Sequence, residues 1–277
     1  IATPASTHYP LALASLQAGK HVLIEKPLSV ASQEATRLIE EADKRGRVLM
    51  VDHTFVYTPA VSALRDIVTR TELGDLLSFD AVRIGRGRYQ SDVNVLWDLA
   101  VHDLAILDYL LGERLNGSYP VAVTAFGRAH RAGFLEDTAT LRLLFDGPLS
   151  ASVHASWLGP QAARRVRLVG SRGIAVCDDL QPLDKVSVYE HGVVQEANDN
   201  LGLPGPVVGR CVRTPHLSDQ PSLDRVASHF VECVRTGTRP LTGGEAGLRV
   251  IRILEAAAQS MVTDGQPVRL EDLHCRV

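Results

Sequence analysis

The chain has 277 residues, a formal net charge of -3 and 45% hydrophobic residues, a composition typical of globular proteins. This charge gives no reason to expect nucleic acid or an anionic membrane surface as a partner, and no apolar run approaches the roughly 20 residues of a membrane span. The four cysteines form no closely spaced pair, which argues against a metal site and a disulfide scaffold and favours a cytoplasmic location.

Short apolar runs alternate with helical patterns in the first part of the chain. Ser29 or Ser32 is expected to cap the second helix, and Gly46 to end it. Strand and helix in alternation predict part of a parallel α/β sheet. The expected elements are residues 6–18 (helix), 21–25 (strand), 32–45 (helix) and 47–51 (strand).

After Tyr57 the pattern changes to short strands separated by tight turns. Thr58 followed by Pro59 predicts the start of a helix that runs to about residue 72. Regularly spaced strands predict an antiparallel meander. Residues 198–221 are rich in Pro and Gly and are expected to form a long loop. The expected strands are residues 77–83, 121–128, 138–145, 149–157, 165–169, 174–177 and 185–190, and the closing helices are residues 222–236 and 244–264.

One helix, residues 94–111, carries a carboxylate and an imidazole within an otherwise apolar pattern. Asp98 and His102 are four residues apart, which places them on the same face of an α-helix. A His oriented by a nearby acid is a common form of general base. The alternative is a helix-stabilising pair at the surface. Gly112 is expected to end the helix with a positive φ.

Lys26 is the second catalytic candidate. It follows a predicted buried parallel strand, and open α/β sheets bind ligands at the carboxyl ends of such strands. His53 follows the next strand and is expected on the same rim. An ammonium there can hydrogen-bond a substrate hydroxyl; the alternative is a solvated side chain paired with Glu25.

The remaining candidates carry weaker signals. Arg83, Arg86 and Arg88 could bind an anionic group or simply form a solvated surface. The glycines near them lack the Gly-x-Gly-x-x-Gly spacing of a dinucleotide fingerprint. Ordinary packing is favoured for three further side chains, His8, His154 and Trp157.

Four segments, in this order, resemble one oxidoreductase family, glucose-fructose oxidoreductase/inositol dehydrogenase (Gfo/Idh/MocA). They are Ala2-Thr3-Pro4 with His8, residues 18–27 ending in Glu25-Lys26-Pro27, Asp98-x-x-x-His102-Asp103, and residues 232–242. Within that family, residues 51–57 and 91–98 look most like dehydrogenases of nucleotide-linked N-acetylhexosamines and their uronic acids, which oxidise C3.

The resemblance implies a Rossmann domain, here residues 1–56, followed by residues 57–277 as a substrate-binding and oligomerisation domain with an open, mainly antiparallel sheet; the last helix could pack back on the first domain. It implies hydride transfer from a sugar or cyclitol hydroxyl to NAD or NADP, in a homodimer or homotetramer. The implied catalytic residues are Lys26, Asp98 and His102; the cofactor would be lined by Thr3, Pro4, His8, Glu25, Lys26, Pro27 and His53; Arg86, Arg88, Asn94 and Trp97 would face the substrate.

The chain departs from the family in one respect. The family's glycine-rich phosphate loop and its ribose-binding acid belong to a segment that would precede Ile1. We expect the chain to be a truncated part of a dehydrogenase that is inactive without that segment. The alternative is a non-catalytic sugar-binding or dimerisation module that has lost its dinucleotide site.

Overall fold

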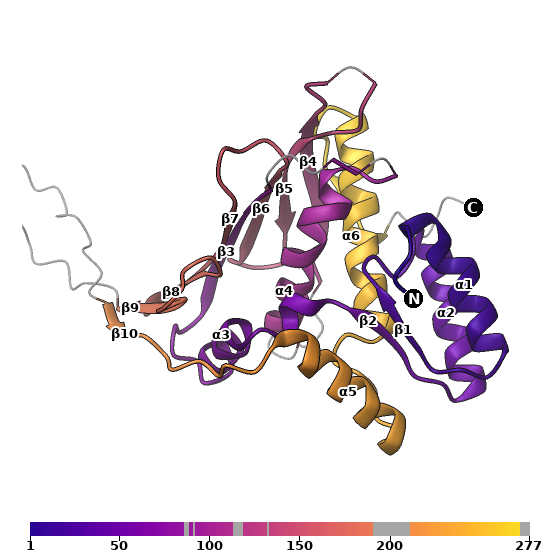
Figure 1. The fold of residues 1–277 in the computed structure, drawn as a ribbon. Helices are drawn as coiled ribbons and strands as arrows, with labels where there is room; N and C mark the ends of the chain where they lie inside the picture. The colour runs from indigo at the N-terminus through magenta and orange to yellow at the C-terminus, as the bar shows by residue number, and fades with distance from the viewer. Residues whose placement is uncertain (86–88, 91, 113–118, 132, 191–210, 272–277) are drawn as a thin grey trace, which may run out of the picture.

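Two β-sheets of unequal size organise the chain, and a computed structural model describes it over residues 1–271 except 86–88, 91, 113–118, 132 and 191–210 (Figure 1). The helices are α1 (His8–Gln17), α2 (Ser32–Arg45), α3 (Pro59–Thr69), α4 (Val101–Leu111), α5 (Ser222–Thr236) and α6 (Gly244–Val262), with short 3-10 segments η1 (Ala5–Thr7) and η2 (Thr54–Tyr57) and a π-helical segment η3 (Leu96–Ala100). The strands are β1 (Val22–Glu25), β2 (Leu49–Asp52), β3 (Leu76–Ile84), β4 (Ala122–Arg128), β5 (Thr138–Leu144), β6 (Ser150–Ser156), β7 (Ala163–Gly170), β8 (Gly173–Asp178), β9 (Val186–Glu190), β10 (Cys211–Arg213) and β11 (Val268–Arg269).

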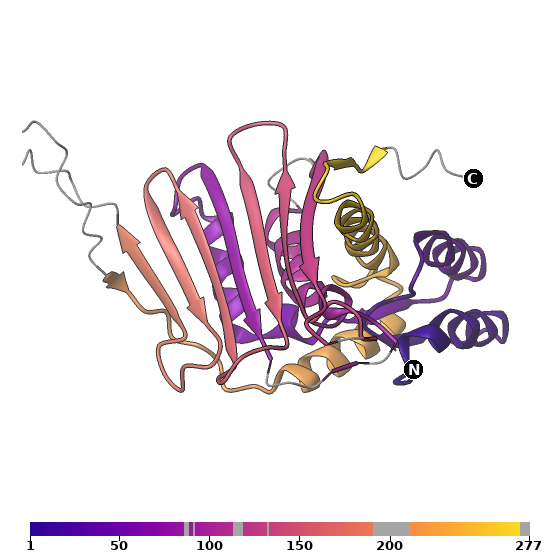
Figure 2. The same cartoon turned by 90° about the horizontal axis from the view of Figure 1, so that it is seen from above.

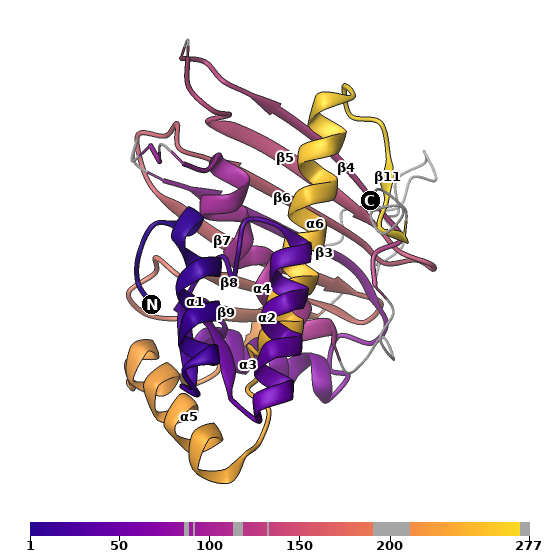
Figure 3. The same ribbon diagram turned by 90° about the vertical axis from the view of Figure 1, so that its right-hand side faces the viewer.

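The small sheet consists of β1 and β2, which pair in parallel from Val22 opposite Leu49 to Glu25 opposite Asp52. Its helices α1 and α2 lie side by side (Figure 3) and share one hydrophobic cluster with the two strands. Ile24 is fully buried in that cluster, as a continuous apolar strand run predicts. The parallel α/β arrangement expected for this part is therefore confirmed.

The free edge of β2 is closed by the segment before α6. The backbone N–H of Val51 donates to the carbonyl of Thr242 at 2.8 Å, and Met50 forms an isolated bridge with Gly243. The expected serine cap of α2 is wrong: Ala31 is the capping residue, and the N–H of Ser32 donates instead to the Glu255 carboxylate of α6 at 2.8 Å. Parts of the chain far apart in sequence thus complete the small sheet and its helix.

The large sheet has nine strands in the order β10-β9-β8-β7-β3-β6-β5-β4-β11. Apart from the parallel β3–β6 pair, neighbouring strands are antiparallel. A simple meander is therefore wrong, because β3 is inserted between β6 and β7. Helices α3, α4 and α6 cover one face of this sheet (Figure 2).

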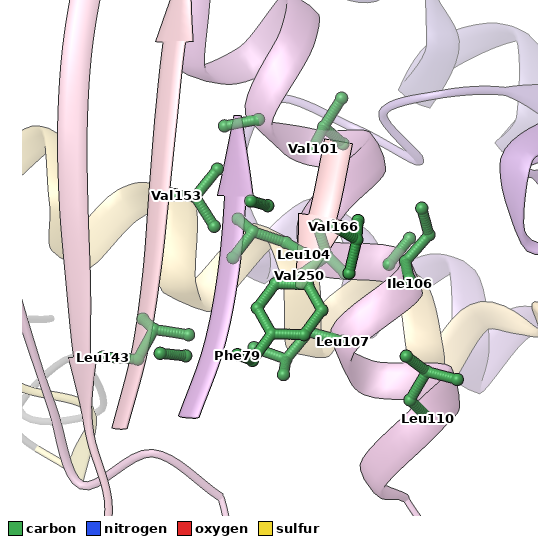
Figure 4. Packing of buried hydrophobic residues seen from close by; sticks show 14 of the residues in the cluster. Phe79, Val101, Leu104, Ile106, Leu107, Leu110, Leu143, Val153, Val166 and Val250 are labelled. Atoms are coloured by element: carbon green, nitrogen blue, oxygen red, sulfur yellow. The ribbon is translucent and has the colours of Figure 1, made fainter. Parts of the chain in front are cut away.

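The main core lies between the large sheet and these helices (Figure 4). Phe79 of β3 and Leu104 of α4 are fully buried there. Three expectations about chain ends and turns need correction. Gly112 has φ of -51°, so it continues the helical conformation. Cys211–Arg213 forms a strand inside the expected loop, whose residues 198–210 lie outside the described part, and β11 was not predicted.

Across the described residues, the structure contains no helix with the length and apolar character needed to cross a membrane.

Candidate active site

Three segments that are distant in sequence meet at the carboxylate of Asp98. Lys26 follows β1, and its Nζ donates to Asp98 Oδ1 at 3.1 Å and to the Asp98 carbonyl at 2.7 Å. The Lys26 and Asp98 side chains are 18% and 15% exposed, so solvent reaches the ion pair. The strand end places Lys26 at the edge where parallel sheets bind ligands.

Trp157, immediately after β6, completes the setting of Asp98. Its indole Nε1 donates to Asp98 Oδ2 at 2.9 Å, so each carboxylate oxygen has its own donor. Trp157 is 1% exposed. Sequence reasoning assigned it to packing; the signal that could have found this role is that a buried indole N–H needs an acceptor.

His102 does not pair with Asp98, which corrects the expected Asp-oriented base. The structure gives no hydrogen bond between them, and the edge-to-face contact of the ring is with Phe55, at 4.7 Å between centroids and 67° between planes. The reason is the π-helical segment η3, whose wider turn precedes α4 and breaks the four-residue alignment of an α-helix. Asp98 is therefore the ion-pair partner of Lys26, and His102 is near enough for the Lys26 charge to lower its pKa.

The electrostatic setting keeps His102 neutral. Burial, the charge of Arg83 and the charge of Lys26 hold the pKa of His102 well below its usual value. Its Nδ1 is buried without a hydrogen-bond partner, while the residue as a whole is partly exposed. A neutral, partly accessible imidazole can accept a proton, which an imidazolium cannot.

His53, at the end of β2, is buried on the same rim. Both ring nitrogens lack a hydrogen-bond partner among the described residues, and burial, with a contribution from Lys26, lowers the pKa of His53 to about 3. At neutral pH the ring is uncharged. Unpartnered buried polar atoms of this kind call for an explanation in a native structure, and here they adjoin Lys26 and His102, whose pKa the His53 ring also affects.

Two carboxylates lie at the same carboxyl edge of the small sheet. Glu25 and Asp52 are opposite each other in the β1–β2 register, and burial together with the Asp52 charge raises the pKa of Glu25. Asp52 also accepts a hydrogen bond from the Thr54 hydroxyl at 2.7 Å.

The residues expected along the cofactor upstream of Lys26 form a local network. The two ring nitrogens of His8 lie 2.6 Å from the Pro27 carbonyl and 2.9 Å from the Thr3 carbonyl. Thr3 also accepts from the Thr7 hydroxyl, and Pro4 precedes η1. His8 thus ties the first turn to the Lys26-Pro27 segment, and the structure gives it a supporting role in the geometry of that loop.

The residues expected to face the substrate have mixed outcomes. Asn94 lies two residues before η3: its Oδ1 accepts from the Leu96 N–H at 3.1 Å, and its Nδ2 donates to Glu136 at 3.0 Å. Trp97 is partly buried against both hydrophobic clusters. Arg86 and Arg88 lie outside the described residues, and the substrate contacts of all four stay predictions.

Arg83 is not an open anion site. Its guanidinium is buried and makes two hydrogen bonds of 2.8 Å to Asp103, so the anion-binding role considered from the sequence is wrong for this residue. Among the described residues there is no cluster of three or more His, Cys, Asp or Glu side chains able to hold a metal ion.

Comparison with known proteins agrees with this arrangement. Residues 1–53 match the description "Oxidoreductase family, NAD-binding Rossmann fold", and residues 61–176 match "GFO/IDH/MocA C-terminal domain". UDP-N-acetylglucosamine 3-dehydrogenase of Acidithiobacillus ferrooxidans is 31% identical over 252 residues, which cover 91% of this chain and 74% of that protein. The chain belongs to the Gfo/Idh/MocA family. It is therefore an oxidoreductase of a family whose first domain binds NAD.

Two further similarities place the chain within this family. The solved structure of the Acidithiobacillus ferrooxidans enzyme has a TM-score of 0.75 and 30% identity, covering 94% of this chain and 76% of that one. Trans-1,2-dihydrobenzene-1,2-diol dehydrogenase of Bos taurus is 29% identical, covering 86% of this chain and 69% of that protein. Members of the Gfo/Idh/MocA family that resemble this chain thus include enzymes named for different hydroxyl substrates.

The described residues fit the nicotinamide end of an NAD molecule. Lys26 and His53 directly follow β1 and β2 at the carboxyl edge of the small sheet, and the unpartnered ring nitrogens of His53, together with Nδ1 of His102, offer polar partners for a carboxamide. The Gly-x-Gly-x-x-Gly pattern that holds the pyrophosphate in Rossmann folds does not occur in the printed sequence. The fit is therefore to one end of the cofactor.

Proposed function

We propose that the chain carries the catalytic groups of an NAD(P)-dependent dehydrogenase that oxidises a hydroxyl of a sugar or cyclitol. The observation that carries this proposal is that the Lys26 ammonium, at the carboxyl edge of a parallel sheet, contributes to lowering the pKa of His102, whose imidazole is therefore neutral. In this proposal His102 accepts the hydroxyl proton. Lys26 hydrogen-bonds the same oxygen and stabilises negative charge on it.

Asp98 and Trp157 hold the ammonium in place for that contact. Asp98 binds Lys26 through both its carboxylate and its backbone carbonyl, and Trp157 fixes the other carboxylate oxygen. When bound, NAD or NADP supplies the acceptor for the hydride that leaves the hydroxyl-bearing carbon. The chain's own work is to orient the hydroxyl and to take up its proton.

The substrate class that we favour is a nucleotide-linked sugar oxidised at C3. It is supported by the 31% identity to the UDP-N-acetylglucosamine 3-dehydrogenase. Within the proposal, the substrate-facing residues remain Arg86, Arg88, Asn94 and Trp97, and the cofactor-lining residues remain Thr3, Pro4, His8, Glu25, Lys26, Pro27 and His53.

The domain division and assembly are also part of the proposal. We place the cofactor domain at residues 1–56 and the substrate domain at residues 57–277, with α6 contacting α2 and β2 on one side and α4 and β4 on the other. We propose a cytoplasmic homodimer or homotetramer that uses the outer face of the large sheet, the face opposite α3, α4 and α6 (Figure 2). Sedimentation equilibrium measures the assembly directly.

The test is titration of NAD+ and NADP+ by calorimetry, followed by assays of nicotinamide reduction with UDP-N-acetylglucosamine, free sugars and cyclitols. It is made on the printed chain and on the chain extended upstream in its reading frame. In the active form, His102→Ala lowers kcat about a hundredfold or more, the usual range for a general base. The matched control is His216→Ala, because His216 is exposed and lies outside both the proposed catalytic site and the large sheet.

Two results would contradict the proposal. One is an unchanged kcat in His102→Ala, which would remove the base. The other is failure of both forms to bind either dinucleotide, which would leave a sugar-binding or assembly module.

A further inference from the structure

Arg83 on β3 forms the most deeply buried ion pair among those the structure describes. Its Nε and one terminal nitrogen each donate to a different oxygen of Asp103 at 2.8 Å, and the two side chains are 5% and 2% exposed. Replacing a buried pair by apolar residues is often neutral for stability. Stability alone therefore does not account for two charges at this place.

The same guanidinium holds an aromatic ring that touches the proposed base. The Arg83 guanidinium carbon lies 4.2 Å from the centroid of the Phe55 ring, and Arg164 lies over the same ring at 5.2 Å. Phe55 in turn meets His102 edge to face at 4.7 Å. His102 Nδ1 has no hydrogen-bond partner among the described residues, so the edge-to-face contact with Phe55 is available to orient the imidazole.

We propose that Arg83, clamped by Asp103, is a positioning residue for His102 that acts through the Phe55 ring. The assignment rests on the proposed role of His102 as the base. The order of contacts is Asp103 to Arg83 by two hydrogen bonds, Arg83 to Phe55 by a cation–π contact, and Phe55 to His102 by an edge-to-face contact.

The charge of Arg83 adds an electrostatic effect to this geometry. Burial lowers the pKa of His102 most, and Arg83 is the largest charged contributor. A base must be neutral before it can accept a proton, so a cation close to the ring keeps the imidazole in its proton-accepting form as the pH falls, and it also lowers the basicity of the ring. The charged and titratable groups around the imidazole are Lys26 after β1, His53 after β2, Arg83 on β3, Arg164 on β7, and Asp98 and Asp103 on the helical segment of His102 itself.

The experiment is a histidine titration by NMR with 13Cε1-labelled histidine, in which His102→Gln assigns the signal. It compares the unaltered protein with the double variant Arg83→Met/Asp103→Asn, which removes both charges and leaves neither one buried alone. Arg83→Met alone is not used in this titration because it leaves the buried Asp103 carboxylate without its cationic partner. The matched control is Arg167→Met, which breaks an ion pair with Asp80 in the middle of the neighbouring strands β3 and β7, where the two side chains are 55% and 32% exposed.

The expected result is a rise in the pKa of His102 in the double variant, because Arg83 is the largest charged contributor to its lowering, and no change in the control. An unchanged His102 titration in the folded double variant overturns the proposal. A second variant, Phe55→Leu, removes the ring and keeps the charge; in the active enzyme it should lower kcat about tenfold with KM unchanged, which is less than the roughly hundredfold or greater loss expected when the base itself is removed. An unchanged kcat there overturns the role of Phe55.

This test is separable from that of the proposed function, because the titration needs neither cofactor nor substrate. A raised pKa of His102 in a protein that is inactive in both the printed and the extended form would support the contact of Arg83 with His102 through Phe55 and count against the dehydrogenase. An unchanged pKa of His102 in an active double variant would overturn the positioning assignment and leave the dehydrogenase proposal standing.

Discussion

Two ion pairs of the same helical stretch differ in what surrounds them. The side chains of Lys26 and Asp98 are 18% and 15% exposed, and the second carboxylate oxygen of Asp98 accepts from the Trp157 indole. The side chains of Arg83 and Asp103 are 5% and 2% exposed and are joined by two parallel hydrogen bonds. Asp98 and Asp103 are only five residues apart. Because solvent reaches the Lys26–Asp98 pair, its lysine can also bind a substrate. The Arg83–Asp103 pair is closed to solvent, so its groups contact only the residues packed around them. The two carboxylates thus have different work in one site.

The largest expected effect comes from breaking the sealed pair on one side only. Arg83→Met leaves Asp103 buried without its cation, and this should lower the free energy of unfolding by about 3–5 kcal/mol. Urea unfolding measures it. Arg167→Met, which removes a cation that is 55% exposed and paired with Asp80, should cost about 1 kcal/mol or less. Equal losses in the two variants would remove the distinction between sealed and exposed pairs.

A second prediction concerns the acid sensitivity of the site. His53 has a pKa of about 3 when folded and about 6.5 when unfolded. Between these values the unfolded state binds more protons, so the contribution of His53 to stability is present above about pH 6.5 and is lost as the pH falls. Between about pH 7 and about pH 4 the unaltered protein should lose about 3 kcal/mol more than His53→Gln.

Urea unfolding at the two pH values measures this difference, and His154→Gln, a change on the outer sheet face, is the control. Parallel pH dependence in the unaltered protein and His53→Gln would show that His53 takes up its proton in the native state.

The two tryptophans of the chain allow a test of the hydrogen bond that the Trp157 indole donates to Asp98. Replacing Trp157 by its benzothiophene analogue keeps the shape and removes the N–H that Asp98 Oδ2 accepts, which should cost about 2 kcal/mol. The same replacement at Trp97 is the control, since the described residues show no hydrogen bond from its indole. In an Asp98→Asn background the Trp157 effect should shrink if it acts through the carboxylate. An effect of the same size there would show that the Trp157 N–H does not act through the Asp98 carboxylate.

The smallest expected effect on stability is that of the open pair. Lys26→Met should change the free energy of unfolding by about 1 kcal/mol or less, because Asp98 keeps its indole donor and access to water. Turnover in the active form should nevertheless fall by about a hundredfold or more. A variant that lost stability and kept its turnover would make Lys26 a structural residue.

Local patterns predicted most elements of this molecule. Apolar periodicity located β1 and β2, and the Thr58 hydroxyl accepts from the Val61 N–H at the start of α3 as its position before a proline predicts. Such features depend on neighbours in sequence. Strand order does not, and the insertion of β3 between β6 and β7 follows from long-range pairing that a strand's own residues do not specify.

The site shows the same division. The position of Lys26 after a buried strand predicted the edge on which it lies. The four-residue spacing paired Asp98 with His102, and this pairing fails because the spacing presumes an α-helical period through what is a π-helical segment. Trp157 and Phe55 were missed because their roles depend on which distant side chains lie beside them.

The closure of β2 by residues next to α6 bears on how the chain is made. The hydroxyl of Thr242 donates to Val51 across 191 positions of sequence, and Glu255 caps α2 across 223. At about 5–20 residues per second, a ribosome needs roughly 10–40 seconds to synthesise the intervening chain. During that interval the nascent chain has an unpaired strand edge of the kind that recruits other strands. Chaperone dependence should therefore be greatest for nascent chains that stop short of Thr242, and should fall once α6 has emerged.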